Sequence, residues 1–248
     1  MRDSFSDEVT IEFRQVGYRV NGRPLIGDLN LEVRRGETVV LLGRTGSGKT
    51  TILKLINRLL CPSEGMVLVE GRSTAEWDAI QLRRKIGYVI QETGLFPHFT
   101  VERNVGTVPR LEGWPAARVK ERVEEMLSLV GLEPLRFRNR YPHQLSGGQR
   151  QRVGVARALA GDPPILLMDE PFGALDPLTR VETQREFTAL KQRVKKTIVV
   201  VTHDLREALT LANRIALVEE GKLVGVYSPE EFLRSTEPAV SQYVNAYK

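Results

Sequence analysis

The sequence contains one cysteine, Cys61, which excludes an internal disulfide. It has no apolar run that approaches the roughly 18 to 20 residues needed to span a bilayer. Residues 1–4 lack the charged-then-apolar pattern of a secretion signal. We therefore expect a cytoplasmic chain that cannot form a membrane channel by itself.

A concentrated run of like charge is also missing. The formal net charge is +5, yet lysine and arginine are interspersed with acidic residues, and the basic run at residues 83–85 is short. Such dispersal is more typical of solvated faces than of a nucleic-acid interface, so no nucleic-acid partner is predicted. The excess of positive charge would suit a position beside the anionic inner leaflet of a membrane. With 248 residues, the chain can form one α/β domain with a sizeable core and a subdomain.

A glycine-rich segment at residues 43–50 predicts a phosphate-binding loop. It follows the apolar run 38–42, of strand length, and opens into the helical pattern 51–56, which is the strand-loop-helix context this motif requires. Glycines permit positive φ and close approach to an anion, a lysine adds charge near the β and γ phosphates, and a threonine hydroxyl suits Mg²⁺. An ordinary βα turn with an incidental lysine would not need both flanking elements. The predicted nucleotide-binding residues are Gly43, Arg44, Thr45, Gly46, Ser47, Gly48, Lys49, Thr50 and Thr51.

Two carboxylates end a second apolar run at residues 165–168. Asp169 and Glu170 would project where α/β folds keep their ligands, at the carboxyl end of a buried strand. We expect Asp169 to be a Mg²⁺ partner, directly or through water, and Glu170 to polarise the attacking water. The alternative is a solvated acidic turn before Pro171.

Residues 145–149 are Leu-Ser-Gly-Gly-Gln. Ser146 is typical of an N-cap, and the two glycines after it would leave backbone amides exposed at the positive end of a helix. This pattern predicts a second anion site, formed by Ser146, Gly147, Gly148 and Gln149.

Together these motifs resemble the nucleotide-binding subunit of an ATP-binding cassette transporter, over nearly the whole chain. Five motifs occur in the family's order: the 145–149 signature, the acidic pair, the 174–176 turn, Gln91 after one strand and His203 after another. The resemblance implies that Gln91 contacts Mg²⁺ and the water while sensing a membrane partner. It also implies that His203 hydrogen-bonds the γ-phosphate, and that Tyr18 stacks on adenine, although a tyrosine there is commonly packing. The predicted metal ligands are Thr50, Gln91 and Asp169.

The resemblance further implies a dimer. Two chains would face head to tail around two ATP, with the signature of each binding the γ-phosphate held by the other, and Asp176 linking the two sites. ATP would join the dimer and hydrolysis would release it. The implied partners are integral membrane permease subunits and an extracytoplasmic substrate-binding protein, with the chain peripheral on the cytoplasmic face of the membrane.

The expected fold is α/β: a P-loop NTPase core with a mainly parallel sheet, an N-terminal antiparallel β subdomain and an inserted α-helical signature subdomain. The chain would form a single domain, 1–248, in three segments. Residues 1–91 would contain the antiparallel strands, among them 9–13 and 66–70, and the first part of the nucleotide core. Residues 92–160 would form the helical subdomain, and residues 161–248 would complete the core. A helix is predicted at 115–130 from its apolar face, and the last helix begins at a capping box, residues 228–231.

The loop at residues 93–100 carries exposed apolar candidates. Leu95, Phe96 and Phe99 could receive a helix of the membrane partner, next to Gln91. The alternative is a loop folded onto its own core.

Cargo is inferred from resemblance alone. Residues 82–91, 94–98, 108–114 and 172–177 resemble the ATPases of osmoprotectant importers, which take up glycine betaine, choline, carnitine or proline betaine. Two departures stand out: the pair of C-terminal regulatory modules of many such ATPases is not expected here, and Arg44-Thr45 replaces a common Pro-Ser. The alternatives are another cargo (amino acids, lipids or metal chelates) and, less favoured, a cassette protein of nucleic acid or the ribosome, or a soluble P-loop kinase, which would lack the signature.

Overall fold

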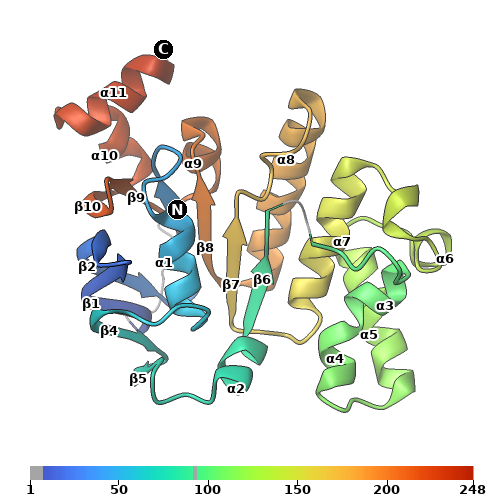
Figure 1. The fold of residues 1–248 in the computed structure, drawn as a ribbon. Coiled ribbons are helices and arrows are strands. Elements are labelled where there is room, and N and C mark those ends of the chain that lie inside the picture. Colours follow the sequence, from blue (N-terminus) through green and yellow to red (C-terminus); the bar gives the residue numbers. More distant parts are fainter. Residues whose placement is uncertain (1–7, 92–93, 248) are drawn as a thin grey trace. The chain divides into compact units, whose positions relative to one another are not determined.

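The computed structural model describes residues 8–91 and 94–247. The sequence prediction on residues 1–4 therefore lies outside the described residues, as do Glu92 and Thr93, at the start of the predicted helical subdomain and docking loop. The chain forms two compact units, Met1–Arg83 with Lys196–Lys248, and Arg84–Lys195. Figure 1 labels most of their elements. No helix in the described ranges is long and apolar enough to cross a membrane.

The first unit contains an antiparallel sheet in the order β2-β1-β4-β5. Its strands are β1 (Val9–Val20), β2 (Arg23–Arg34), β4 (Glu64–Val69) and β5 (Arg72–Ser73). Asn21 and Gly22 join β1 to β2 with φ of 50° and 78°, the positive values that a tight hairpin turn matching the strand twist requires. The strands predicted at 9–13 and 66–70 are confirmed, apart from the last residue of the second.

The same unit contains strands in the order β10-β9-β3-β8. These are β3 (Thr38–Leu42), β8 (Thr197–Thr202), β9 (Arg214–Glu219) and β10 (Lys222–Tyr227). β3 runs parallel to β8 and β9, whereas β10 is antiparallel to β9. Every residue of β3 and β8 is buried, which explains their apolar runs at residues 39–42 and 198–201. The helices of this unit are α1 (Lys49–Ile56), α9 (Leu205–Leu211), α10 (Pro229–Arg234) and α11 (Pro238–Tyr247).

The second unit combines a parallel strand pair with helices. β6 (Ile86–Val89) pairs with β7 (Ile165–Asp169). The helices are α3 (Val101–Val105), α4 (Thr107–Leu111), α5 (Ala116–Leu129), α6 (Pro134–Phe137), α7 (Gly147–Leu159) and α8 (Pro177–Val194), with α2 (Ala79–Arg84) ending at the boundary between the units. α7 contacts α3, α5, α8 and β6. The helix predicted at 115–130 is α5, with Pro115 and Val130 as its caps and the predicted apolar face buried. The expected α/β class, with an antiparallel sheet and mainly parallel core strands, is confirmed.

Candidate functional site

The predicted phosphate loop connects β3 to α1, as its sequence indicated. Gly46 and Gly48 have φ of 83° and 99°, a region open to glycine at little cost. Lys49 is buried, and its Nζ donates to the carbonyl oxygens of Gly43 and Arg44, both at 2.8 Å. The ammonium group therefore points back into the loop, where a phosphate could replace carbonyl oxygens as its partner.

Gly43 is required for a different reason from the one its motif suggested. Its φ is not positive; instead, a Cβ here would lie 2.2 Å from the carbonyl oxygen of Val218 and 2.6 Å from Ser47 Oγ. The buried Ser47 Oγ has no hydrogen-bond partner among the described residues. A shielded, unsatisfied hydroxyl beside a lysine and positive-φ glycines suits an anionic ligand such as a nucleotide phosphate.

His203 lies at the same sheet edge as the phosphate loop. β3 and β8 pair in parallel with Leu42 opposite Thr202, so the loop and His203 each follow the carboxyl end of a neighbouring strand. Thr202 Oγ1 donates to Glu207 Oε2 at 2.8 Å and accepts from the Asp204 amide at 3.0 Å. These bonds hold the main chain on both sides of the exposed His203.

Tyr18 is half-buried on β1, opposite Ile26 of β2. This position leaves part of the ring accessible and allows either packing or base stacking. Its predicted role at adenine stays a prediction.

In the second unit, Asp169 is the last residue of a fully buried strand and is itself only 5% exposed. The Tyr88 hydroxyl, on the neighbouring strand β6, donates to Asp169 Oδ2 over a long 3.5 Å. Burial raises the pKa of Tyr88 well above its ordinary value, and the Asp169 charge raises it further. Tyr88 therefore stays protonated and can steady this carboxylate, a role that the sequence did not reveal.

Glu170 occupies an uncommon backbone conformation. Its φ is 43°, which a non-glycine residue adopts at a cost and which is more frequent at functional sites. Its carbonyl oxygen accepts from the Gly173 amide at 3.2 Å, closing the turn after β7. Glu170 and Gly147 line one cavity of about 350 Å³. The buried Gln151, whose Nε2 has no hydrogen-bond partner in the described ranges, lines the same cavity.

The signature residues form the start of α7, as predicted. Ser146 Oγ accepts from the Gln149 amide at 3.2 Å, and Gln149 Oε1 accepts from the Ser146 amide at 3.0 Å, a complete capping box. A Cβ on the buried Gly148 would lie 2.7 Å from the Thr179 methyl of α8. Gly148 therefore permits close packing of two helix starts, a requirement that its motif did not reveal.

Asp176 is the N-cap of α8, with its Oδ1 accepting from the Thr179 amide at 3.1 Å. Hydrogen bonds from Thr179, side chain first and backbone second, lower the pKa of Asp176. The exposed carboxylate is thus held ionised at the first turn of its helix.

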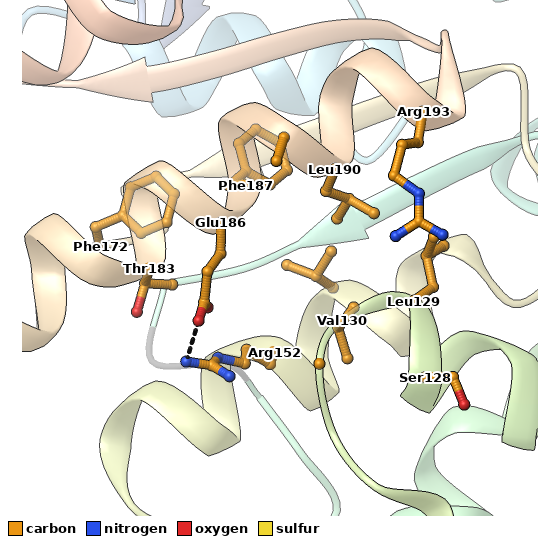
Figure 2. A pocket seen from close by; sticks show the side chains of 13 residues that line it. Ser128, Leu129, Val130, Arg152, Phe172, Thr183, Glu186, Phe187, Leu190 and Arg193 are labelled. Atoms are coloured by element: carbon orange, nitrogen blue, oxygen red, sulfur yellow. Dashed lines mark ion pairs between the residues drawn. The ribbon is translucent and has the colours of Figure 1, made fainter.

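Helices α7 and α8 are joined farther along. Arg152 of α7 and Glu186 of α8 form an ion pair at 2.7 Å, drawn as the dashed line in Figure 2. The pair lies at a cavity of about 240 Å³ whose apolar lining includes Phe187 and Leu190 of α8 and Val130 after α5 (Figure 2). None of the residues that line this cavity is a predicted site residue.

The predicted docking loop is held by a residue that the sequence analysis missed. Asn104 is fully buried; its Oδ1 accepts from the Phe96 amide at 2.8 Å, and its Nδ2 lies 3.1 Å from the carbonyl oxygens of Phe96, Phe99 and Thr100. Arg157 donates to the Gly94 carbonyl at 2.8 Å, and burial lowers the pKa of Arg157. Phe96 is 41% exposed, so the loop is rigidly held and still presents an aromatic ring.

Neither Asn104 nor Tyr88 could be found from spacing alone. Gln91 follows β6, as predicted, and its side chain is exposed. Among the described residues, no group of three or more His, Cys, Asp or Glu could hold a metal ion. Mg²⁺ is commonly held by one or two protein oxygens together with substrate phosphates. Thr50 and Asp169 are oxygen donors of that kind.

Comparison with known proteins places this site in a family. The profile described as "ABC transporter" matches residues 26–173, which include the phosphate loop, the 145–149 signature and the acidic pair. The chain belongs to the ABC transporter family. The resemblance recognised from the motifs is thereby confirmed.

Curated relatives within the family carry transport names. The chain is 50% identical over 228 residues to the osmoprotectant import ATP-binding protein OsmV of Salmonella typhimurium, covering 91% of this chain and 59% of that protein. It is 50% identical over 214 residues to the glycine betaine/carnitine/choline transport ATP-binding protein OpuCA of Bacillus subtilis, covering 86% and 56%. It is 49% identical over 229 residues to the glycine betaine uptake system ATP-binding protein YehX of Escherichia coli, covering 92% and 73%. The chain thus spans somewhat more than half of the first two relatives.

Two solved structures share the fold. CbiO1 of Clostridium perfringens, part of the ABC transporter complex CbiONQ, is 26% identical with a TM-score of 0.84, covering 97% of this chain and 96% of that one. The ATP-binding cassette MJ0796, solved as a dimer in a post-hydrolysis state with ADP and Pi, is 34% identical with a TM-score of 0.77, covering 88% and 98%.

Proposed function

We propose that this chain is an ATP-hydrolysing subunit that powers a membrane permease for the import of quaternary-amine osmoprotectants such as glycine betaine or choline. The observation that carries the proposal is the phosphate loop: a buried Lys49 directed at loop carbonyls beside positive-φ Gly46 and Gly48. The identity of about half to osmoprotectant ATP-binding proteins supports the cargo class.

The loop residues 43–51 would bind the phosphates of ATP, with Lys49 neutralising charge and Thr50 offering a hydroxyl to Mg²⁺. Asp169 and Gln91 would complete the oxygen ligands of the metal, and Tyr18 would face adenine. When bound, Mg²⁺ would neutralise charge on the phosphates. The Tyr88 hydroxyl would keep the Asp169 carboxylate oriented.

Glu170 is proposed as the general base that polarises water, and His203 as the donor to the γ-phosphate. The carboxylate of Glu170 can accept a proton from water, while its turn is closed by the Gly173 amide. Phosphoryl transfer depends mainly on positioning and electrostatics. The bonds of Thr202 to Glu207 and Asp204 supply such positioning for His203.

The capped start of α7 is proposed as an anion site for the γ-phosphate of ATP held by a second subunit. The Ser146 hydroxyl accepts from Gln149 and can still donate its proton. Two chains would then face head to tail, with Asp176 between the two sites. The dimeric MJ0796 structure supports the assembly of two chains.

The loop held by Asn104 is proposed to receive a permease helix, with Phe96 as the exposed contact. This would place the chain on the cytoplasmic face of the membrane as a peripheral subunit. The importer class also implies an extracytoplasmic substrate-binding protein. The second candidate function is that of an ATPase subunit that powers the transport of another cargo, such as amino acids, lipids or metal chelates.

The test is uptake of labelled glycine betaine and choline by cells that carry the complete transporter. Glu170→Gln should retain ATP binding, lose turnover and uptake, and accumulate the ATP-bound dimer. Glu121→Gln, an exposed position on α5, is the matched control and should transport normally. Brisk hydrolysis by the Glu170→Gln variant would overturn the proposed base. If the parent protein hydrolyses ATP but the cells take up neither compound, the proposed ATPase activity would stand and the proposed cargo would be rejected.

A further inference from the structure

The C-terminal helix α11 is anchored in the first unit by its apolar face. Val240 is fully buried and Val244 is 6% exposed, and the helix contacts α9 and α10. On its exposed side, Gln242 Oε1 accepts a hydrogen bond at 3.2 Å from an Nη of Arg44. A helix near the end of the chain is therefore bonded directly to a residue of the phosphate loop.

Arg44 joins this helix to the lysine of the loop. Its carbonyl oxygen accepts from Lys49 Nζ at 2.8 Å and from the Ser47 amide at 3.2 Å. Its main chain is thus part of the cradle around Lys49, while its guanidinium lies against Gln242 of α11. A shift of the Arg44 side chain would be transmitted to the carbonyl that orients the lysine.

The surroundings of Arg44 restrict its guanidinium further. A cavity of about 270 Å³ is lined by loop residues 44–47, by Glu219 at the end of β9, by Glu220 of the turn that follows, and by Gln242. Burial raises the pKa of the nearby Tyr243, the Glu219 charge raises it further, and Arg44 opposes both. The guanidinium therefore lies among an acceptor on α11, a phenol on α11 and the acidic turn.

The far end of α11 contacts a second element of the nucleotide site. The Arg206 guanidinium lies 5.5 Å from the centre of the Tyr247 ring. Arg206 belongs to α9, whose N-cap Asp204 directly follows His203. One helix thus contacts both the phosphate loop and the helix that follows His203.

We propose that Gln242 is a positioning residue for nucleotide binding, which holds the phosphate loop through Arg44 without touching the nucleotide. The inference rests on the proposed function, because it assigns Gln242 to the same ATP site. Loss of the acceptor would let the Arg44 main chain move and would misplace the carbonyl that orients Lys49. The effect should fall on ground-state binding, since neither Gln242 nor the Arg44 side chain belongs to the hydrolytic chemistry.

The experiment compares three variants of the full protein. Gln242→Leu removes the acceptor at similar size, Gln242→Glu retains an oxygen opposite Arg44, and Asn245→Leu makes an equivalent change at an exposed position of α11 that does not line the cavity. Equilibrium binding of a fluorescent ADP derivative, kcat and KM for ATP, and Tm are measured for each. We expect Gln242→Leu to weaken nucleotide binding and raise KM about three- to ten-fold, the range for the net contribution of one typical hydrogen bond, with kcat little changed. Gln242→Glu should bind as the parent does.

A double-mutant cycle with Arg44→Met tests whether Gln242 acts on the phosphate loop through Arg44. If Arg44 carries the effect, Gln242→Leu should cause no further loss in the Arg44→Met background. Equal nucleotide affinity in Gln242→Leu and the parent, equal weakening in Gln242→Glu, or a fall in Tm without a change in KM would each overturn the inference while leaving the proposed function in place. A parent protein that binds no nucleotide would overturn both.

Discussion

Replacing Ser146 with alanine separates the stability of the signature helix from its function, because the chain contains a matched control. Ser228 begins α10 with the same capping box: its Oγ accepts from the Glu231 amide at 3.2 Å, as Ser146 Oγ does from Gln149. The reciprocal bonds, to Glu231 Oε2 and Gln149 Oε1, measure 2.7 and 3.0 Å. Each serine-to-alanine change therefore removes one equivalent cap acceptor.

The expected stability losses are equal. Losing an N-cap hydroxyl costs about 1 kcal/mol, which shifts the Tm of a protein of this size by about 2–4 °C. Against a typical total of about 5–15 kcal/mol, this loss leaves nearly all molecules folded at 25 °C. A fall in turnover at that temperature must therefore have another cause.

The two variants should differ in ATP turnover. Ser146 can donate its hydroxyl proton to a phosphate while it caps α7, and a hydrogen bond to a charged group contributes about 1.5–3 kcal/mol. Phosphate release at 25 °C should therefore fall about ten-fold or more in Ser146→Ala and stay near the parent rate in Ser228→Ala. Thermal unfolding is measured alongside, to verify that the two Tm shifts match.

Two results would refute this reasoning. Parent-like turnover in Ser146→Ala would remove Ser146 from the nucleotide site. Equal turnover losses in both variants would mean that helix stability, not phosphate contact, limits the reaction.

Further predictions concern the loop, the docking surface and acid stability. Gly43→Ala should destabilise the protein by about 1–3 kcal/mol in chemical denaturation and weaken nucleotide binding, because the new Cβ would lie 2.2 Å from the Val218 carbonyl. Phe96→Asp should abolish uptake while preserving ATP binding, because a carboxylate would replace the exposed ring of the docking loop. Asp176 has a pKa lowered by Thr179, so its charge contributes stability above the unfolded pKa of about 3.9, and this contribution is lost as pH falls through the folded pKa. Asp176→Asn should therefore be less stable than the parent at pH 7, and the difference should shrink as pH falls below about 3.9 and vanish once pH is below the folded pKa.

Each of these predictions has a control. Leu111→Asp changes an apolar side chain that is 66% exposed and should leave uptake intact; loss of uptake there would undermine the choice of Phe96. An unchanged free energy of unfolding in Gly43→Ala would contradict the close approach of this residue to the Val218 carbonyl. A stability difference for Asp176→Asn that is the same at pH 7 and about pH 3 would exclude the charge as its cause.

Local signals predicted much of the architecture. The strand-loop-helix around Lys49, the N-cap at Ser146, the capping box at Ser228 and the amphipathic α5 were all anticipated, with boundaries accurate to a residue or two. Each depends on hydrogen bonds or side-chain periods within a few positions, so the residues that specify it are adjacent in the chain.

Two glycines have a packing requirement that motif reasoning missed. Gly43 was expected to use positive φ, and Gly148 to expose backbone amides. In the structure, the absence of a Cβ on Gly43 leaves room for the Val218 carbonyl oxygen. The absence of a Cβ on Gly148 leaves room for the Thr179 methyl group. Close approach between distant segments has no local signature, because it depends on where two backbones meet.

The sequence by itself determined the family, the strand-loop-helix around Lys49 and the helix starts at Ser146 and Ser228, since these follow from residue types at short, regular spacing. Only the tertiary structure decided that Asn104 holds the loop around Phe96, that Tyr88 contacts Asp169, and that Gln242 meets Arg44 across 198 positions. Such contacts arise when packed strands and helices bring remote side chains together. No periodicity in the chain encodes which of many exposed glutamines will face a given arginine.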